Sequence, residues 1–322
     1  MYAAFENAFL TDNGGWKRRD PPTDAQIQCL DASNEVPERI FCGTFGDGLY
    51  RSVDSGETWE HVDVATNVMS LTVDPHDPDE VWLGTEPSAV YHSTDGGETW
   101  AEKPGLTDLP SASEWYFPPR PDTHHTRWIA VDPGDPEHLY VGIEAGALVQ
   151  THDKGETWED RVSTARLDNH TLATHPDAPD RAYSAAGDGY AETHDKGETW
   201  TYPQDGLKHR YVWSIAVDSA DPDTVLVSSA SGARRAHASS NPESYVYRRD
   251  NGGTWQQCLE GLPGPDGMIR PVLAAGAAHE FYALTNRGLY RSSDSGEHWH
   301  DLGIEWDESL TTQRPRGLAC IK

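Results

Sequence analysis

Basic side chains recur at the start of short apolar runs in a strongly acidic chain. The sequence has 53 Asp and Glu residues against 25 Lys and Arg, which gives a formal net charge of −28. Several short apolar runs nevertheless begin with a polar or basic residue, and these residues are Gln28, Asn67, Arg127, His170, Arg210, Arg270 and Arg316. Arginine carries a planar fork of donors that suits a carboxylate, sulfate or phosphate. The pattern predicts an anion-binding site if the fold brings these residues together.

Histidines, arginines and aromatic residues stand close to the same positions. The candidate ligand-binding residues are Trp115, Tyr116, His124, His125, Arg127, His170, His209, Arg210, Arg234, Arg270 and Arg316. A partly buried cluster of this kind remains effective at high salt, because burial reduces screening. The alternative is that the arginines only form ion pairs with the abundant acidic residues around them.

Two glutamates occupy matching places at the ends of apolar runs. Glu86 follows Gly84, and Glu144 follows Gly142, each with one residue between. Two carboxylates that face each other across a pocket can act as general acid and base in glycoside hydrolysis. We therefore take Glu86 and Glu144 as the candidate catalytic pair, although acidic residues are common throughout this chain.

The histidines allow a different chemistry. Neutral imidazoles suit divalent transition metals, and His124, His125, His170 and His209 could converge with help from Glu144. The sequence has no close-spaced set of metal ligands. We therefore predict no metal and no other cofactor.

An eight-residue motif, Ser-x-Asp-x-Gly-x-Thr-Trp, sets the arrangement of these residues. Six copies or close variants are present, together with a clipped copy at 11–16, and the six are 52–59, 93–100, 151–158, 193–200, 248–255 and 292–299. The basic spacing is about 42 residues, and two gaps are longer. Each copy suits a hairpin turn, because the aspartate can accept hydrogen bonds from the turn and the glycine permits positive φ.

Short apolar runs between the motifs predict strands. Runs at 68–73 and 81–84, and at 127–131 and 139–142, are separated by segments rich in Asp and Pro. Two more strands flank each motif, so one repeat has four strands, which is typical of a β-propeller blade. We predict an all-β chain, a single domain over 1–322, with seven blades of four antiparallel strands. Segment 317–322 should supply the first strand of the blade whose next two strands are 1–6 and 8–11.

The repeats resemble those of the Asp-box, or BNR-repeat, β-propellers over essentially the whole chain. The resemblance implies that the motif aspartates are structural, namely Asp54, Asp95, Asp153, Asp195, Asp250 and Asp294. The superfamily includes sialidases, xyloglucan-hydrolysing enzymes, sorting receptors and the photosystem II assembly-factor family. Sialidases have six blades and an Arg-Ile-Pro pattern that this chain lacks. Seven blades are nearer to the assembly factors and to each half of the xyloglucan enzymes.

Propeller geometry assigns the motif turns to one face and the candidate residues to the other. Two long insertions, 110–125 and 231–243, belong to this second face, around the mouth of the central channel. Long loops on a rigid scaffold often carry binding sites. The first insertion includes three consecutive aromatic residues, Trp115, Tyr116 and Phe117.

Three functions follow as alternatives. The first is a propeller that binds an acidic small molecule, a sugar or an acidic protein segment at its mouth. The second is a glycoside hydrolase, sialidase-like or xyloglucanase-like, that acts on an acidic or a neutral sugar. The third is an assembly scaffold that docks through 110–125.

The composition of the chain limits its partners and its cellular environment. The negative charge argues against nucleic acid and anionic membranes as partners. An acidic surface with only six lysines and a mean hydropathy of −0.70 resembles proteins adapted to molar salt. No signal peptide or long apolar segment is present. We expect a cytoplasmic, halophilic monomer.

Overall fold

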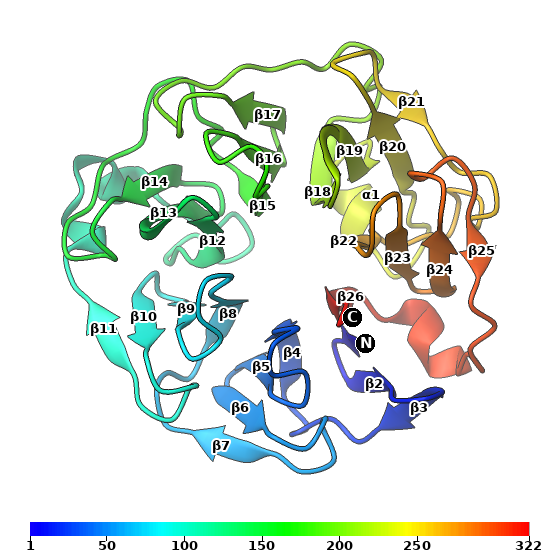
Figure 1. Ribbon diagram of the computed structural model, residues 1–322, viewed down its shortest axis with the longest axis horizontal. Helices are drawn as coiled ribbons and strands as arrows, with labels where there is room; N and C mark the ends of the chain where they lie inside the picture. The colour runs from blue at the N-terminus through cyan, green and yellow to red at the C-terminus, as the bar shows by residue number, and fades with distance from the viewer. Residues whose placement is uncertain (322) are drawn as a thin grey trace.

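Seven antiparallel sheets surround a central channel in the computed structural model, which describes residues 1–321 (Figure 1). We call the sheets blades I to VII. The strands of the first three blades are β26 (Pro315–Ala319), β1 (Tyr2–Phe5), β2 (Ala8–Asp12) and β3 (Trp16–Arg19) in blade I, β4 (Gln26–Ala32), β5 (Ile40–Phe45), β6 (Leu49–Ser52) and β7 (Glu60–Val62) in blade II, and β8 (Val68–Val73), β9 (Val81–Thr85), β10 (Val90–Ser93) and β11 (Ala101–Lys103) in blade III.

The other four blades complete the ring. Their strands are β12 (Thr126–Asp132), β13 (Asp135–Ile143) and β14 (Ala147–Thr151) in blade IV, β15 (Asn169–Thr174), β16 (Ala182–Ala186) and β17 (Gly189–Thr193) in blade V, β18 (Tyr211–Asp218), β19 (Asp221–Ala230), β20 (Tyr245–Arg249) and β21 (Gln256–Gln257) in blade VI, and β22 (Val272–Ala275), β23 (Phe281–Thr285), β24 (Gly288–Ser292) and β25 (His300–Asp301) in blade VII. The predicted seven-bladed all-β fold is confirmed.

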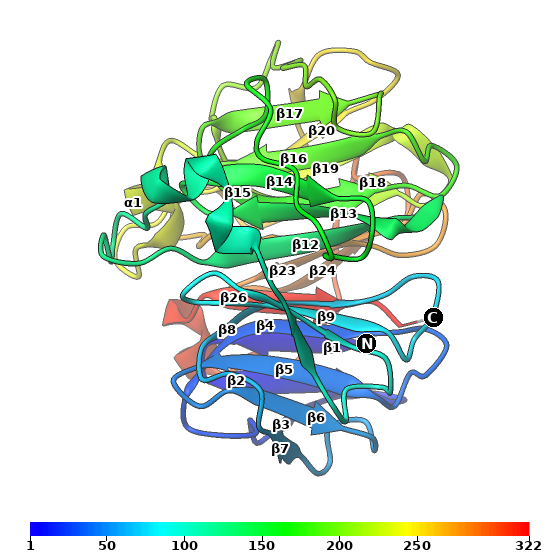
Figure 2. The same ribbon diagram turned by 90° about the vertical axis from the view of Figure 1, so that its left-hand side faces the viewer.

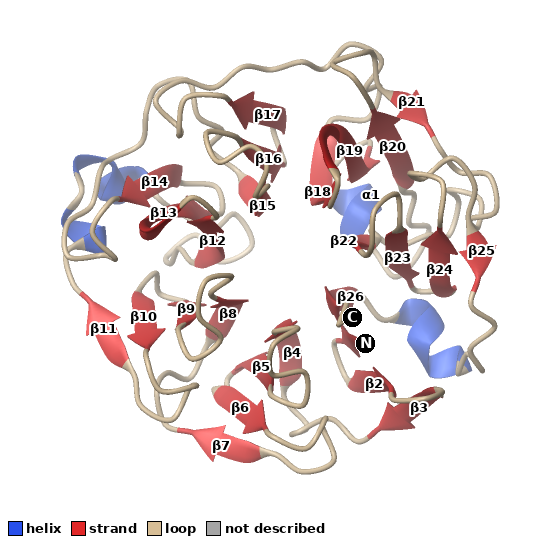
Figure 3. Ribbon diagram, viewed as in Figure 1, coloured by secondary structure: helices blue, strands red, loops and turns tan. Residues whose placement is uncertain are grey.

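Two blades depart from the predicted four regular strands. Blades IV and V have three, and the outer position is held by single bridges, Gln150 to Glu159 and Glu192 to Thr201. The described chain also contains little helix, as Figure 3 shows. Its helices are η1 (Leu106–Asp108), η2 (Pro110–Glu114), α1 (Ala233–His237) and η3 (Glu308–Thr312). None of these helices has the length and apolar character needed to cross a membrane.

Blade I joins the two ends of the chain, as the sequence predicts. Tyr2 pairs with Ala319 and Ala4 pairs with Gly317, so β26 forms the innermost strand beside β1. The predicted strand 317–322 in fact begins at Pro315 and ends at Ala319, and Lys322 lies outside the described residues. Pairing of β26 with β1 covers an edge that an open array would leave exposed.

The innermost strands are apolar because each sheet packs between two others. Strand β18, for example, has seven buried residues out of eight. Inner strands of neighbouring blades contact one another around the ring. This packing explains why the predicted runs at 68–73 and 81–84 are nearly continuous in apolar residues rather than alternating.

The motif turns have the predicted structure in most copies. Asp54 accepts hydrogen bonds from the backbone of Thr58 at 2.8 Å and from its hydroxyl at 2.6 Å. Gly56 has φ of 79°, and Ser55 before it also has positive φ. In the copy at 248–255 the first position is Arg248, which forms an ion pair with Asp250 at 2.9 Å instead.

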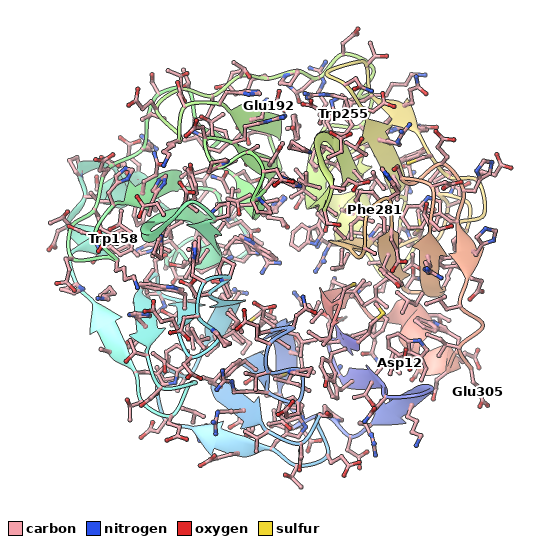
Figure 4. All side chains as sticks on the ribbon, in the orientation of Figure 1. Asp12, Trp158, Glu192, Trp255, Phe281 and Glu305 are labelled. Atoms are coloured by element: carbon pink, nitrogen blue, oxygen red, sulfur yellow. The ribbon has the colours of Figure 1, made fainter. Side chains whose placement is uncertain are left out.

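The motif tryptophans join neighbouring blades. Trp255 donates from Nε1 to the Pro203 carbonyl at 2.7 Å, and Trp158 donates to the Pro104 carbonyl at 2.9 Å. Both lie in the outer part of the ring (Figure 4). Each tryptophan therefore ties its own blade to the segment before it.

Candidate anion-binding pocket at the channel mouth

Both long insertions lie on the same face of the ring. In the side view of Figure 2, the short helix η2 of the first insertion and α1 of the second project from the same side. Residues from the two insertions line one pocket of about 620 Å³, together with the first residues of several innermost strands. The predicted assignment of the insertions to the channel mouth therefore agrees with the structure.

Arg270 is the most deeply buried arginine of this pocket. Its side chain precedes β22 and is only 2% exposed. Nε donates to Nδ1 of His237 at 3.0 Å, and Nη1 donates to the Pro315 carbonyl at 3.0 Å. Nη2 has no hydrogen-bond partner, and no carboxylate in residues 1–321 forms an ion pair with this guanidinium. Burial, followed by the charges of Arg316 and Arg127, lowers the pKa of Arg270 well below its usual range.

Two further arginines reach the pocket from the start of β26. Arg314 forms an ion pair with Glu6 at 2.6 Å, and Arg316 contacts the same oxygen at 3.0 Å. Burial lowers the pKa of Arg316 to about 10, even though Glu6 opposes the effect. One carboxylate therefore serves two arginines, and the local charge remains positive.

Two guanidinium groups contact the ring of Trp213, which lines the pocket. Arg270 lies over the ring of Trp213 with its Cζ 3.7 Å from the centroid, and Arg127 lies 4.9 Å from it. Cation–π contact stabilises a guanidinium that has lost water. Arg127, Trp213 and Arg316 also line a second cavity of about 340 Å³ inside the channel, where apolar residues and Asp31 form the walls.

The first insertion supplies one wall. Phe117, Pro118 and Pro119 line the pocket, and the guanidinium of Arg120 lies 4.7 Å from the Phe117 ring. Arg120 also binds both oxygens of Glu86, at 2.6 and 2.5 Å. This bidentate pair fixes the insertion to the end of blade III.

The second insertion supplies the opposite wall through α1. Arg234 and His237 both line the pocket. His237 accepts from Arg270 at Nδ1, so its proton resides on Nε2 and is donated to the hydroxyl of Tyr211 at 2.7 Å. Burial, followed by the charge of Arg270, lowers the pKa of His237 well below its usual range. The imidazole is thus a neutral link between Arg270 and Tyr211.

The two candidate catalytic glutamates share one histidine. His125 is almost fully buried and lies 3.3 Å from Glu86 Oε2 and 2.9 Å from Glu144 Oε2. Burial would raise the pKa of Glu86, but His125 and Arg120 outweigh it and hold the pKa at about 2. Burial would also raise the pKa of Glu144, but His125, His170 and Arg127 outweigh it and hold this pKa well below its usual range. Both carboxylates are therefore ionised and already bound by cations.

The structure brings together about half of the predicted site residues. Those that line the pocket are His125, Arg127, Glu144, Arg234, Arg270 and Arg316. His170 is fully buried beside it. Glu86 lies in the wall behind Arg120.

The remaining predicted residues lie elsewhere. Trp115 is 5% exposed and packs in the core of blade IV, whereas Tyr116 projects to solvent. His124 contacts the edge of Trp115. His209 stacks on Tyr245, and Arg210 lines a separate surface depression.

Several polar or aromatic pocket residues were not among the predicted site residues, and they include Arg120, Asp168, Tyr211, Trp213, His237 and Arg314. Arg314 stands two positions before Arg316, and Trp213 two positions after Tyr211. Register shifts at Arg316 in β26 and at Trp213 in β18 interrupt the two-residue alternation of these strands, so that alternation does not identify Arg314 or Trp213. Arg120 and Asp168 lie in loops, where no such period applies.

A family model described as photosynthesis system II assembly factor YCF48 matches residues 10–210. The chain belongs to this family. Two solved YCF48 structures share its fold. One, "YCF48 bound to D1 peptide", is 19% identical with a TM-score of 0.63, over 96% of this chain and 89% of that one. The other, from Cyanidioschyzon merolae, is 16% identical with a TM-score of 0.62, over 92% and 89%.

The fold is also found in glycoside hydrolases. An ancestral GH74 enzyme aligns over 92% of this chain with a TM-score of 0.68 and 17% identity. This YCF48-family chain spans 41% of that enzyme's length, and 53% of the Niastella koreensis GH74 enzyme. No curated protein matches the sequence. At these identities the solved structures show a shared fold.

Proposed function

We propose that this propeller binds an acidic segment of a protein partner in the arginine-lined pocket at its channel mouth. The observation that carries the proposal is the state of Arg270. Its guanidinium is buried and has a free Nη2 donor and no carboxylate partner among the described residues. A buried charge without a counterion costs several kcal/mol (roughly 3–5), and an incoming carboxylate removes that cost.

The surroundings suit a peptide carboxylate rather than a bare ion. The pocket has a volume of about 620 Å³ and presents Phe117, Pro118 and Pro119 beside the arginines. Apolar and aromatic walls with a few directed donors are typical of sites that hold organic ligands. The family is one of assembly factors, and one solved member has a D1 peptide bound.

The alternative of glycoside hydrolysis receives less support from the geometry. A general acid needs a raised pKa so that it carries a proton near neutral pH. Glu86 and Glu144 instead have lowered pKa values and are bound by Arg120, His125 and Arg127. Their arrangement favours a structural role in the pocket wall.

Docking through exposed aromatic residues of 110–125 is also less well supported. Trp115 is buried and donates from Nε1 to the Ser111 hydroxyl at 3.0 Å, and Phe117 faces the pocket. Of the three aromatic residues, Tyr116 is the one whose side chain is exposed, at 50%. The insertion thus serves better as a wall of the pocket than as a separate docking surface.

Peptide binding to wild-type protein and Arg270→Met tests the proposal. The probes are fluorescein-labelled peptides with Asp and Glu, each with a matched Asn and Gln analogue, measured by anisotropy in 0.2 M and in molar KCl. Loss of one partner of a buried charge pair costs about 2–5 kcal/mol, so we expect Arg270→Met to weaken binding at least about 30-fold.

Arg291→Gln is the control, because Arg291 is exposed on the outer part of blade VII and pairs with Glu280 there. It should bind the acidic peptides like wild type. Equal binding of acidic and neutral peptides, or undiminished binding by Arg270→Met, would overturn the proposal.

A further inference from the structure

Three side chains with metal-ligand atoms converge at the edge of the pocket. Glu144 follows β13, Asp168 precedes β15, and His170 lies on β15. One ligand atom from each lies within 4.8 Å of the other two. They come from blades IV and V, so the rigid ring, and not a flexible loop alone, holds them in place.

The orientation of His170 points to a cation. The ring is fully buried, and Nδ1 lies 2.7 Å from the carbonyl oxygen of Val212. A carbonyl accepts a hydrogen bond, so Nδ1 carries a proton, and in the neutral form of the ring Nε2 directs its lone pair into the cluster. Histidines that bind metals are held by the same kind of bond from the second ring nitrogen to a carbonyl or carboxylate.

Neither carboxylate oxygen near Nε2 forms a hydrogen bond with it. Asp168 Oδ1 lies 3.7 Å and Glu144 Oε1 lies 3.9 Å from Nε2, both beyond hydrogen-bond distance. His125 and Arg127 contact the other oxygen of Glu144, and within residues 1–321 Oε1 accepts no hydrogen bond. The hydroxyl of Tyr211, which accepts from His237, donates a long hydrogen bond to Nε2 at 3.4 Å, and a bound metal would replace it.

These separations suit a shared ion. Two ligand atoms that each lie about 2.1 Å from a metal are about 3.4 Å apart at the tetrahedral angle and about 3.8 Å apart at wider angles. One imidazole nitrogen and two carboxylate oxygens form a set that binds Zn²⁺ and neighbouring divalent transition metals.

We propose that Glu144, Asp168 and His170 form a binding site for a divalent transition metal, with Zn²⁺ as the best-suited ion. Because Glu144 and Asp168 also line the pocket, the site opens toward it. This inference is independent of the peptide-binding proposal, since the metal alone is the ligand tested.

A second group of possible ligands provides a control. Asp294, Glu297 and His298 also lie within reach of one another, but their side chains are exposed or half-buried in a motif turn. His298 already has Asp294 as a partner at 2.7 Å. A metal held weakly at the surface would therefore be lost on changing His298.

Metal titration of untagged, EDTA-treated protein tests the proposal. Co²⁺ absorbance reports the ligand set, and calorimetry with Zn²⁺ gives stoichiometry and affinity. The variants are Asp168→Asn, His170→Gln and the control His298→Gln. Asp168→Asn keeps the shape of the side chain and an oxygen for the Ala145 N–H, which Asp168 Oδ1 accepts at 3.0 Å, so its folding should be preserved.

We expect one equivalent of Zn²⁺ in wild type and in His298→Gln. Even outer-sphere changes at metal sites cost about 10–100-fold in affinity, so Asp168→Asn and His170→Gln should each lose at least about tenfold. No stoichiometric binding in wild type, unchanged affinity in a folded Asp168→Asn, or loss in His298→Gln alone would overturn the proposal.

Discussion

The guanidinium of Arg270 lies over the ring of Trp213, with its Cζ 3.7 Å from the ring centroid. The two residues belong to neighbouring blades, VII and VI. An aromatic face offsets only part of the cost of burying a charge. The contact therefore leaves Arg270 in position to bind an anion, at the expense of the stability of the empty ring.

We predict that Arg270→Met increases or preserves the stability of the ligand-free protein. Replacing a buried charge by an apolar side chain of similar volume is neutral or stabilising, by about 1–4 kcal/mol in favourable cases. Urea unfolding without ligand measures the change. A large loss of stability would mean that the bonds to His237 and Pro315 matter more than the cost of burying the charge.

We predict that Glu6→Gln destabilises the ring and strengthens binding of acidic ligands. Burial would raise the pKa of Glu6, but Arg316 and Arg314 hold it below its usual range, so the carboxylate is charged. Removing it leaves two more arginines without a counterion and costs on the order of 3 kcal/mol. Thermal unfolding and peptide anisotropy on the same sample should move in opposite directions. Parallel losses in both would contradict the prediction.

We predict that Trp255→Ala destabilises the protein and leaves the pocket intact. Trp255 is buried, packs edge-on against Tyr190 at a centroid distance of 4.9 Å, and bonds to the Pro203 carbonyl. Truncation of a core tryptophan costs about 3–5 kcal/mol. Urea unfolding should show this loss, while peptide affinity in the folded state should stay within about twofold of wild type. The exposed Tyr202→Ala is the comparison for nonspecific effects on affinity.

We predict that Asp31→Asn stabilises the protein above pH 6. Burial raises the pKa of Asp31 to about 6 in the folded chain, above its value of about 4 in an unfolded one. The folded state thus binds this proton more tightly than the unfolded state does. The contribution of protonated Asp31 to the free energy of unfolding is therefore fully present below pH 4 and is lost as pH rises through 6. Asparagine can still accept the bond that Val73 N–H donates to Asp31 at 2.8 Å. Melting temperatures of both proteins should coincide near pH 4 and diverge by pH 8.

The repeats account for most of what the sequence predicts correctly. A motif with Asp, Gly and Trp at fixed spacing defines a turn and a tie to the next blade, and its recurrence defines the ring. The position of a residue within the repeat then sets its distance from the channel. For this reason the repeat places Arg127, Arg270 and Arg316 near the channel, while the structure shows that the three line one pocket.

Loop residues do not follow from the repeat, because their directions depend on packing with other parts of the ring. Trp115 was expected in the pocket, but its indole fills the core of blade IV. Arg120 from the same insertion takes the place beside the pocket, held by Glu86. The pairing of Glu6 with Arg314 and Arg316 likewise depends on closure between distant parts of the chain.

The contact of Glu6 with Arg316 joins residues separated by 310 positions, at the junction where β26 pairs with β1. The pocket is therefore intact only while β26 remains paired with β1. If β26 separates from β1, the arginines of the pocket no longer lie together and the binding site is lost. A ligand in the pocket would slow such opening, and amide exchange along β26 would report it. A partner that docks here would bind propellers whose ring is closed and would not bind those whose ring is open.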